Sequence, residues 1–460
     1  MEPLLARLTE LTGSLAGLLW GNPITLLLLL GIGLYLTLRM GLVQLRGFRH
    51  ATHILGGRYS DPSHQGEVSH FQALATALSA TVGTGNIAGV ATAITLGGPG
   101  ALFWMWMTAF FGMATKFTEC TLALKFREVA PDGSVAGGPM YTLLHGLRMK
   151  RMAVLFAAFA LVASFGIGNM VQANSVVDGI AFIWPELRQD AWLVGVVMAI
   201  LVGLVILGGV KRIARVAATL VPFMAILYIS AALIVLFNHI EAIPGAFATI
   251  FNYALNPWAA GGAAVGEAIR WGVARGLFSN EAGLGSSPMA HAAAKTNEPV
   301  REGLVAMLEP FIDTLVICTM TGLVIVVSGA WEVRPEEMKG AAFTAFAFSE
   351  SLGTGGAIVV GLGLALFAFS TIIAWSYYGD RSAYFLFGEK AVMPYRVVFT
   401  LLVVVGAAVP LELVWNIADI TNLLMALPNL LALVLLAGLV KKLKDEYFKG
   451  PGKSGDTRYK

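Results

Sequence analysis

The chain contains LATALSATVGTGNIAGVATAI (74–94), a segment as long and apolar as a membrane-spanning helix but interrupted in its middle. Three glycines stand there among hydroxyl and amide side chains: Gly83, Gly85 and Gly89 with Ser79, Thr81, Thr84 and Asn86. In hydrocarbon, each unsatisfied backbone group costs several kcal/mol, so irregular backbone is tolerated where it lines a wet cavity. The segment therefore predicts a discontinuous helix beside a cavity.

A second interrupted segment, AVGEAIRWGVARGLFSNEAGLGSS (264–287), lies in the other half of the chain. Its glycines alternate with polar and charged residues: Gly272, Gly276, Gly283 and Gly285 among Glu267, Arg270, Arg275, Asn280 and Glu281. Interrupted spans in corresponding positions of two halves indicate the binding site of a secondary transporter. The alternative is that these glycines only allow close helix packing. Packing does not account for the neighbouring polar residues, so we favour a site at 79–86 and at 272–280.

The composition around these segments is that of a polytopic membrane protein. The 460 residues are 57% hydrophobic and 13% charged, with a mean hydropathy of +0.74, whereas a soluble chain has about 25% charged residues. A span needs roughly 20 mostly apolar residues. This predicts an all-α membrane protein with eleven transmembrane helices, at about 15–38, 67–96, 101–124, 152–183, 192–209, 216–237, 260–282, 304–329, 356–379, 396–410 and 416–440.

The order of these spans predicts an internal repeat. Without the helix at 15–38, the others divide into 67–237 and 260–440, each with five spans and each beginning with a broken helix. Because five is odd, the two halves have opposite orientations, which makes a 5+5 inverted repeat. The remaining parts are an outer N-terminal segment at 1–14, an extra peripheral helix at 15–38, a cytoplasmic loop at 39–66 and a basic cytoplasmic tail at 441–460.

The positive charges set the expected orientation. If the N-terminus is outside, 24 Lys and Arg residues fall in inner segments and four in outer ones. Inner loops carry the excess of Lys and Arg in membrane proteins. We therefore expect a multi-pass protein of the cell (inner) membrane with the N-terminus outside and the C-terminus in the cytoplasm.

The first break has the chemistry for an anion and a cation. Free N–H groups and the positive dipole at a restarting helix attract a carboxylate, and Thr84, Gly85 and Asn86 are placed to offer them. Carbonyls near Ser79 and Val82 suit a hard cation. The span at 356–379 adds two hydroxyls, Ser370 and Thr371, which could complete such a site or bond to their own helix.

Other polar residues lie within the predicted spans. Asn169, Gln172, Ser175 and Asp178 are three residues apart and form a stripe, where Gln172 could orient a substrate or make an interhelical hydrogen bond. Asp178 and Asp313 could relay protons, but we favour structural pairing with Arg270 or Arg275. Five histidines fall in or near loops, where we expect solvated side chains: His64, His70, His145, His239 and His291.

Four segments resemble the alanine or glycine:cation symporter family: GGPGALFWMWMTAFFG (97–112), SATVGTGNIAG (79–89), GGPMYT (137–142) and RGLFSNEAGLGSSPMAHAAA (275–294). The resemblance extends over essentially the whole chain. It implies an amino-acid transporter of the leucine-transporter fold, with Na⁺ or sometimes H⁺ coupling and alanine or glycine as cargo.

The segment VGTGN (82–86) also resembles the first-helix break of neurotransmitter:sodium symporters. That resemblance implies a substrate carboxylate on Thr84 and Gly85. It also implies one sodium site, made by Ser79, Val82, Ser370 and Thr371. At a second sodium site of that fold the expected hydroxyl aligns with Trp271, so we expect one bound Na⁺. The implied substrate-binding set is Thr84, Gly85, Asn86, Gln172, Trp271, Val273, Gly276, Phe278 and Trp375, with Trp271, Phe278 and Trp375 limiting the pocket to small cargo.

Two other classes of protein fit less well. A channel needs a continuous polar pore, and the polar residues occur instead in isolated clusters. A membrane-embedded enzyme would carry a catalytic motif, and no HExxH, GxSxG or Walker-type segment occurs in the sequence. We therefore expect no enzyme activity. The expected partners are a small neutral amino acid and membrane lipids, with no nucleic acid and no obligatory protein partner.

Overall fold

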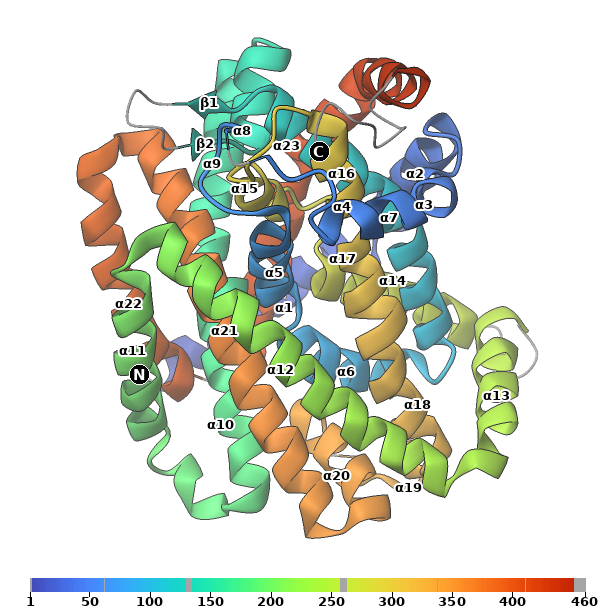
Figure 1. Ribbon diagram of the computed structural model, residues 1–460. Helices are drawn as coiled ribbons and strands as arrows, with labels where there is room; N and C mark the ends of the chain where they lie inside the picture. The colour runs from blue at the N-terminus through green and yellow to red at the C-terminus, as the bar shows by residue number, and fades with distance from the viewer. Residues whose placement is uncertain are drawn as a thin grey trace.

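The computed structural model describes residues 2–61, 63–129, 135–256, 263–336, 338–409 and 411–450, and these are almost entirely helical (Figure 1). The described strands are β1 (Glu128–Val129) and β2 (Val135–Ala136), an antiparallel pair in which Glu128 lies opposite Ala136. The all-helical prediction is confirmed. Residues 260–262 and 410 of two expected spans, and 451–460 of the expected tail, lie outside the described residues.

The N-terminal region differs from the expected single helix at 15–38. It forms α1 (Glu2–Gly21) and α2 (Pro23–Arg39), bent by 48° to one another, so most of the segment at 1–14 is helical as well. The bend falls where Asn22 caps α2, with the Ile24 N–H donating to Asn22 Oδ1 at 2.9 Å. Asn at the cap followed by Pro is a strong helix start, which explains the division.

The first half of the chain continues through short and long helices. In chain order they are α3 (Val43–Arg46), α4 (Phe48–Leu55), α5 (His70–Thr81), η1 (Gly85–Gly89), α6 (Val90–Gly97), α7 (Ala101–Lys125), α8 (Pro139–Tyr141), η2 (Thr142–Gly146), α9 (Lys150–Phe165), η3 (Gly166–Met170), α10 (Val171–Ile183), η4 (Pro185–Arg188), α11 (Ala191–Ile206) and α12 (Gly209–Asn238).

The second half has the same character. Its elements are η5 (Ile240–Ala242), α13 (Ile243–Leu255), α14 (Ala263–Asn280), α15 (Ser287–His291), α16 (Pro299–Ala306), α17 (Leu308–Pro310), η6 (Phe311–Cys318), α18 (Thr319–Val327), α19 (Ala330–Val333), α20 (Gly340–Leu352), α21 (Thr354–Phe387), η7 (Glu389–Ala391), α22 (Val392–Ala408) and α23 (Leu411–Lys449).

Several of these helices can cross a membrane. Within the described residues, six helical stretches are long and apolar enough, and two bent pairs raise the number to eight: 150–183, 209–238, 299–327, 354–387, 389–408 and 412–449, with the pairs 4–21 plus 24–39 and 70–81 plus 85–97. Two further expected spans, α7 and α14, have charged residues among their apolar ones. The count of eleven stays a prediction.

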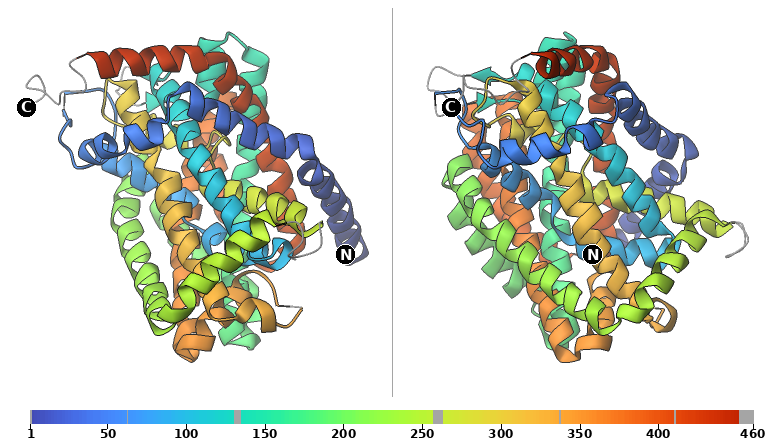
Figure 2. Two further views of the ribbon diagram at one scale, coloured as in Figure 1. Left: turned by 90° about the vertical axis from the view of Figure 1, so that its right-hand side faces the viewer. Right: turned by 45° about the vertical axis from the view of Figure 1, so that its right-hand side comes forward.

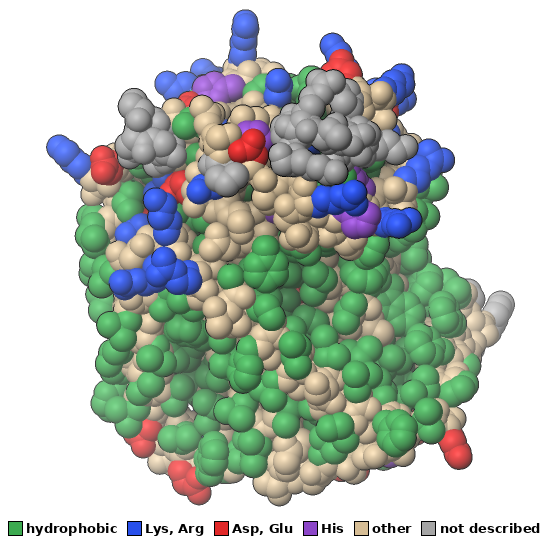
Figure 3. All heavy atoms as spheres, in the orientation of Figure 1, with side chains coloured by type: hydrophobic (Ala, Val, Ile, Leu, Met, Phe, Trp, Pro, Cys, Tyr) green, Lys and Arg blue, Asp and Glu red, His purple; other side chains and the backbone are tan. Residues whose placement is uncertain are grey.

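The centre of the molecule is α21, which packs against α5, α9, α10, α12 and α20. On another side, α14 packs against α6 and α7. Lys and Arg side chains gather at the end of the molecule that carries α15, α16 and the last part of α23 (Figure 3). A band of hydrophobic side chains lies below them on the face in view, and we call the Lys- and Arg-rich end the basic end.

Candidate substrate and cation site

The first break separates α5 from η1. Helix α5 ends at Thr81, Val82 leaves the helical conformation with ψ 88°, and the two halves differ in direction by 51°. Glycine is required here by close approach, because a Cβ on Gly83 would lie 2.5 Å from Thr371 Oγ1 and one on Gly85 would lie 3.0 Å from Ser279 Cα. The predicted discontinuity at 79–86 is therefore present, and α21 and α14 press against it.

The four residues predicted to hold a cation come together beside this break. Ser79 Oγ donates to the Ser370 carbonyl at 2.7 Å, and Ser370 Oγ donates to the Ser79 carbonyl at 3.3 Å. Thr371 Oγ1 lies 3.4 Å from the Val82 carbonyl oxygen. All four residues are buried. The cluster offers carbonyl and hydroxyl oxygens without a thiol or imidazole, which is the donor set that hard cations prefer.

The Ser370 hydroxyl also bonds to the backbone of its own helix, which was the alternative to a cation site. Ser370 Oγ donates to the Phe367 carbonyl of its own helix at 2.8 Å. The hydrogen bond found for Thr371 Oγ1 among the described residues goes across to Val82, the residue that follows α5. A substitution of Thr371 is therefore a better test of the cation site than a substitution of Ser370.

Gln172 joins the first break from α10. Its Oε1 accepts a hydrogen bond from the Thr84 N–H at 3.1 Å, and its Nε2 donates to the Ile167 carbonyl at 2.9 Å. The Thr84 hydroxyl is buried and has no hydrogen-bond partner among the described residues. The side chain of Gln172 therefore fixes the break, and the Thr84 hydroxyl is a polar group available to a ligand.

Asn86 is bound on the opposite side of the break. Its Oδ1 accepts from the Gly83 N–H at 2.8 Å, and its Nδ2 donates to Asp313 Oδ1 at 2.6 Å. The other carboxylate oxygen of Asp313 accepts from Ser279 Oγ at 2.8 Å and Thr314 Oγ1 at 2.7 Å. A hydroxyl from the second broken helix does reach this place, but it comes from Ser279 rather than from position 271.

The expected partners of the acidic residues were wrong. Asp313 binds the neutral groups described above, and Asp178 pairs with Arg188 at 2.7 Å. Arg275 and Arg270, the expected partners, pair with other carboxylates: Arg275 with Asp419 at 2.5 Å and Arg270 with Glu267 at 3.5 Å. The sequence has no short-range signal for Asp419, which is 144 residues from Arg275.

The second break lies further along the chain than 272–280. Helix α14 continues to Asn280, and the irregular residues are 281–286, with Glu281, Gly283 and Gly285 at φ 54°, 92° and 84°. Gly272 and Gly276 lie within the helix, where a Cβ would be 2.4 Å from the Ala101 carbonyl oxygen and 2.3 Å from Thr108 Oγ1. For these two glycines the packing interpretation holds, because they allow α14 to contact α7.

The remaining residues predicted to line the substrate pocket lie in two different places. Trp375 is fully buried, its Nε1 donates to Glu281 Oε1 at 2.8 Å, and its ring presses on Gly168 near Gln172. Trp271 instead lines a cavity of about 420 Å³ together with Arg275, Trp415 and Asp419. Phe278 stacks on Trp415 with ring centroids 4.6 Å apart. Val273 is buried in α14. Trp271 is thus among the residues that line this cavity, and Gly276 and Trp375 are not.

The α1 helix contributes to the same cavity. Thr9, Glu10 and Gly13 are among the residues that line it, and Trp20 Nε1 donates to the Asp419 carbonyl at 3.1 Å. Figure 2 shows α1 lying along the side of the molecule next to α23. Helix α1, which combines most of the expected outer segment at 1–14 with the start of the expected helix at 15–38, thus contacts the helix that carries Asp419.

A helix broken between two half-helices, buried oxygens from a crossing helix beside the break, and a second broken helix together define a secondary transporter of the leucine-transporter fold. The comparisons with known proteins agree. The family described as the Sodium:alanine symporter family matches residues 5–459, and the chain belongs to it. The resemblance seen in the sequence is confirmed, and the protein is a transporter rather than an enzyme.

Individual relatives cover nearly the full length. The chain is 50% identical over 437 residues to the sodium/alanine symporter AgcS of Methanococcus maripaludis, with 94% of this chain and 95% of AgcS covered. It is 38% identical to the probable sodium/glutamine symporter GlnT of Bacillus subtilis, with 95% of this chain and 90% of GlnT covered. The crystal structure of MhsT in complex with L-phenylalanine matches with a TM-score of 0.56 at 12% identity, covering 83% of this chain and 99% of that one, which shows the fold alone.

Proposed function

We propose that the protein couples inward movement of Na⁺ to uptake of a small neutral amino acid, alanine or glycine, by alternating access. The observation that supports this most strongly is the oxygen cluster of Ser79, Val82, Ser370 and Thr371 beside the first break. Na⁺ bound there would connect the end of α5 to the middle of α21. The ion would thereby stabilise the arrangement in which Gln172 holds the Thr84 backbone, which gives a physical link between ion and substrate.

The proposal includes the topology. Eleven membrane-spanning segments and two five-helix inverted repeats fit the two broken helices, and a single bound Na⁺ fits the oxygen cluster of Ser79, Val82, Ser370 and Thr371. With the basic end in the cytoplasm, the N-terminus would be outside and the C-terminus inside.

The choice of cargo rests partly on the relatives. AgcS is named a sodium/alanine symporter and GlnT a probable sodium/glutamine symporter, so relatives of similar length are named for different neutral amino acids. The higher identity to AgcS and the buried Trp375 beside the site favour a small side chain. An H⁺-coupled transporter of the same fold is the second candidate.

The test is uptake by the purified protein in proteoliposomes. An inward Na⁺ gradient should drive concentrative, saturable uptake of radiolabelled alanine, and an equal K⁺ gradient should not. Competition by glycine, valine, leucine and glutamine would rank the cargo. Uptake that follows a proton gradient and ignores Na⁺ would replace the first candidate with the second.

A further inference from the structure

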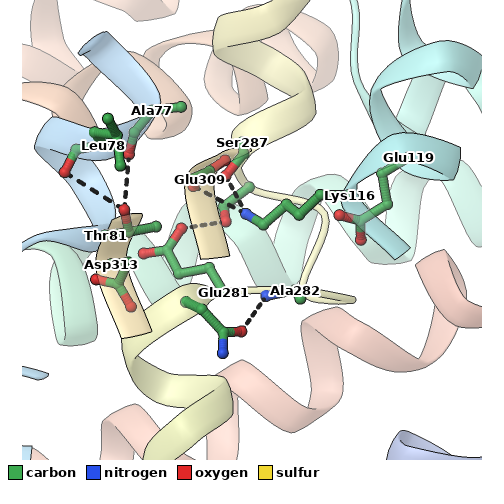
Figure 4. A network of polar contacts seen from close by, with 12 residues as sticks. Ala77, Leu78, Thr81, Lys116, Glu119, Glu281, Ala282, Ser287, Glu309 and Asp313 are labelled. Carbon is green, nitrogen blue, oxygen red and sulfur yellow. Dashed lines mark hydrogen bonds and ion pairs between the residues drawn. The ribbon is translucent and has the colours of Figure 1, made fainter. Parts of the chain in front are cut away.

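A group of ionisable side chains is buried between the second break and the basic end. We call it the buried ionic network; its members are His70, Lys116, Glu119, Glu281, His291, Glu302 and Glu309, each at most 3% exposed. Figure 4 shows Lys116 and Glu119 on α7, Glu281 just after α14 and Glu309 on α17. The expectation that His70 and His291 are solvated was wrong, because the fold covers both with α16 and its neighbours.

Two imidazoles share one carboxylate within this network. His70, the first residue of α5, donates from Nδ1 to one oxygen of Glu302. His291, the last residue of α15, donates from Nδ1 to the other oxygen at 2.5 Å. The second ring nitrogen of His291, Nε2, lies 3.8 Å from Glu309 Oε2. His291 thus stands between two carboxylates, an environment that favours its charged form.

The same network extends to the candidate substrate site. Lys116 Nζ donates to Glu309 Oε1 at 3.0 Å, and Ser287 Oγ donates to the same oxygen at 2.7 Å. Beyond Lys116, Glu281 accepts from Ser286 and, at 2.8 Å, from the indole N–H of Trp375. Polar contacts therefore run from His70 at the beginning of α5 to Lys116 and Ser287, and the adjacent residue Ser286 donates to Glu281, which accepts from Trp375.

The charges of the network do not balance without bound protons. Its four carboxylates face one ammonium group, Lys116. Among the described residues, further titratable groups interact with the network, namely Cys120 of α7 together with Arg127, Asp313 and Tyr378. Arg127 and Asp313 are of opposite charge type, so they do not change the balance. An uncompensated buried charge is costly, so protons on the imidazoles or carboxylates stabilise the packed arrangement.

We propose that the buried ionic network binds exchangeable protons and releases them when the path from the substrate site to the basic end opens. The proposal rests on the alternating-access function above. Opening such a path requires α5 and α15 to move away from α16, which separates both imidazoles from Glu302. Water then enters, and His291 without its carboxylate partners holds its proton less tightly.

The sign of the pH dependence follows from this proton count. Because the closed form binds more protons than the open form, acid conditions at the basic end stabilise the closed form. Raising the pH there favours opening. For coupling to one proton, the ratio of open to closed molecules rises by at most about tenfold per pH unit.

Na⁺-driven alanine uptake at different lumenal pH values tests the inference. The liposomes hold the basic end in the lumen, the outer pH is fixed, and the lumenal pH is varied from about 5.5 to about 8.5, the range in which imidazoles titrate. The wild-type rate should rise with lumenal pH. His70→Gln and His291→Gln should flatten the profile while the dependence on Na⁺ concentration stays that of the wild type. His145→Gln is the matched control, because His145 also pairs with a glutamate, at 2.7 Å, but its side chain is 42% exposed.

Hydrogen–deuterium exchange of the unmodified protein gives a result that does not depend on the variants folding or on uptake. Corrected for intrinsic exchange chemistry, residues 70–81 and 287–306 should lose protection as the pH rises, and α12 should not. A pH-independent protection pattern in the wild type would overturn the proton site even if Na⁺-driven uptake is found. Folded His291→Gln protein with the wild-type pH profile would do the same. If Na⁺ does not drive uptake but the exchange pattern is the expected one, the proposed function is rejected and the proton site is retained.

Discussion

At the first break, residues 82–84, the groups in contact are backbone carbonyls, hydroxyls and the amides of Gln172 and Asn86. At the second, residues 281–286, the contacts lead through Glu281, Ser286 and Ser287 to Lys116 and Glu309. Both segments look alike in sequence, since each is a glycine-rich interruption of an apolar span. The comparison teaches that the same kind of glycine-rich interruption can be surrounded by different chemistry: mainly neutral oxygens and amides at the first break, ionisable side chains at the second.

The largest expected effect is at the second break. Lys116→Met leaves the Glu309 carboxylate buried without its ammonium partner, which costs about 3–5 kcal/mol in comparable buried pairs. We expect low yield and a strongly lowered melting temperature in detergent.

The double variant Lys116→Met with Glu309→Gln should recover much of this stability, because it removes the unpaired charge. Lys150→Met, at an exposed position, is the control and should melt like the wild type. A stable Lys116→Met protein would show that the second break does not depend on ionic pairing, and the contrast between the breaks would fail.

The next largest effect is at the first break. In Gly83→Ala the new Cβ lies 2.5 Å from Thr371 Oγ1 and 3.0 Å from Gln172 Oε1, so both groups must move. Overpacking of this kind costs about 1–3 kcal/mol, and we expect uptake to fall by roughly tenfold to a hundredfold. Gly89→Ala, whose Cβ would come no closer than 3.9 Å to Thr84 O, is the control in the same segment. Equal initial uptake rates of the two variants at equal protein would show that the close approach of Thr371 and Gln172 to Gly83 does not matter for transport.

Thr371→Val tests the cation directly. The change keeps the shape and removes one oxygen, and a lost charge-assisted contact is worth roughly 1.5–3 kcal/mol, or about a tenfold to hundredfold weaker affinity for Na⁺. The apparent affinity for alanine should fall at low Na⁺ and recover at high Na⁺, because binding linkage is reciprocal.

The measurement is alanine uptake against Na⁺ concentration at equal protein. Ser376→Ala is the control, because Ser376 lies on the same helix and its hydroxyl donates to its own backbone at Ile373. If the Na⁺ curves of wild type and Thr371→Val superimpose, the cation does not bind at Thr371.

Local sequence was sufficient for the features that depend on backbone chemistry. Glycines beside hydroxyls predicted the first break, and a pair of adjacent hydroxyls predicted where α21 would meet it. The second break was placed too early, because Gly272 and Gly276 give the same signal for packing against α7 as for an interruption. The long-range ion pairs were missed for another reason. Arg275 with Asp419 and Lys116 with Glu309 join residues 144 and 193 positions apart, and nothing in a single sequence specifies such partners.

The smallest expected effect distinguishes the buried Trp375 from Trp271, which lines the cavity. Trp375→Phe reduces a fully buried ring beside Gly168 and Glu281, so the space next to the substrate site grows. Space for one methylene in an apolar pocket changes discrimination between two substrates by about 1–3 kcal/mol. Because the site also loses the indole hydrogen bond to Glu281, we expect a change at the lower end of this range. The ratio of valine to alanine uptake should rise by about fivefold to tenfold. Trp271→Phe changes a ring that lines the cavity beside Arg275 and Asp419, so it should leave this ratio within about twofold of the wild type. Competition of valine against radiolabelled alanine measures both variants in one assay. A shift in selectivity for Trp271→Phe with none for Trp375→Phe would place the pocket for the cargo side chain in the cavity that α1 lines, rather than between the two breaks.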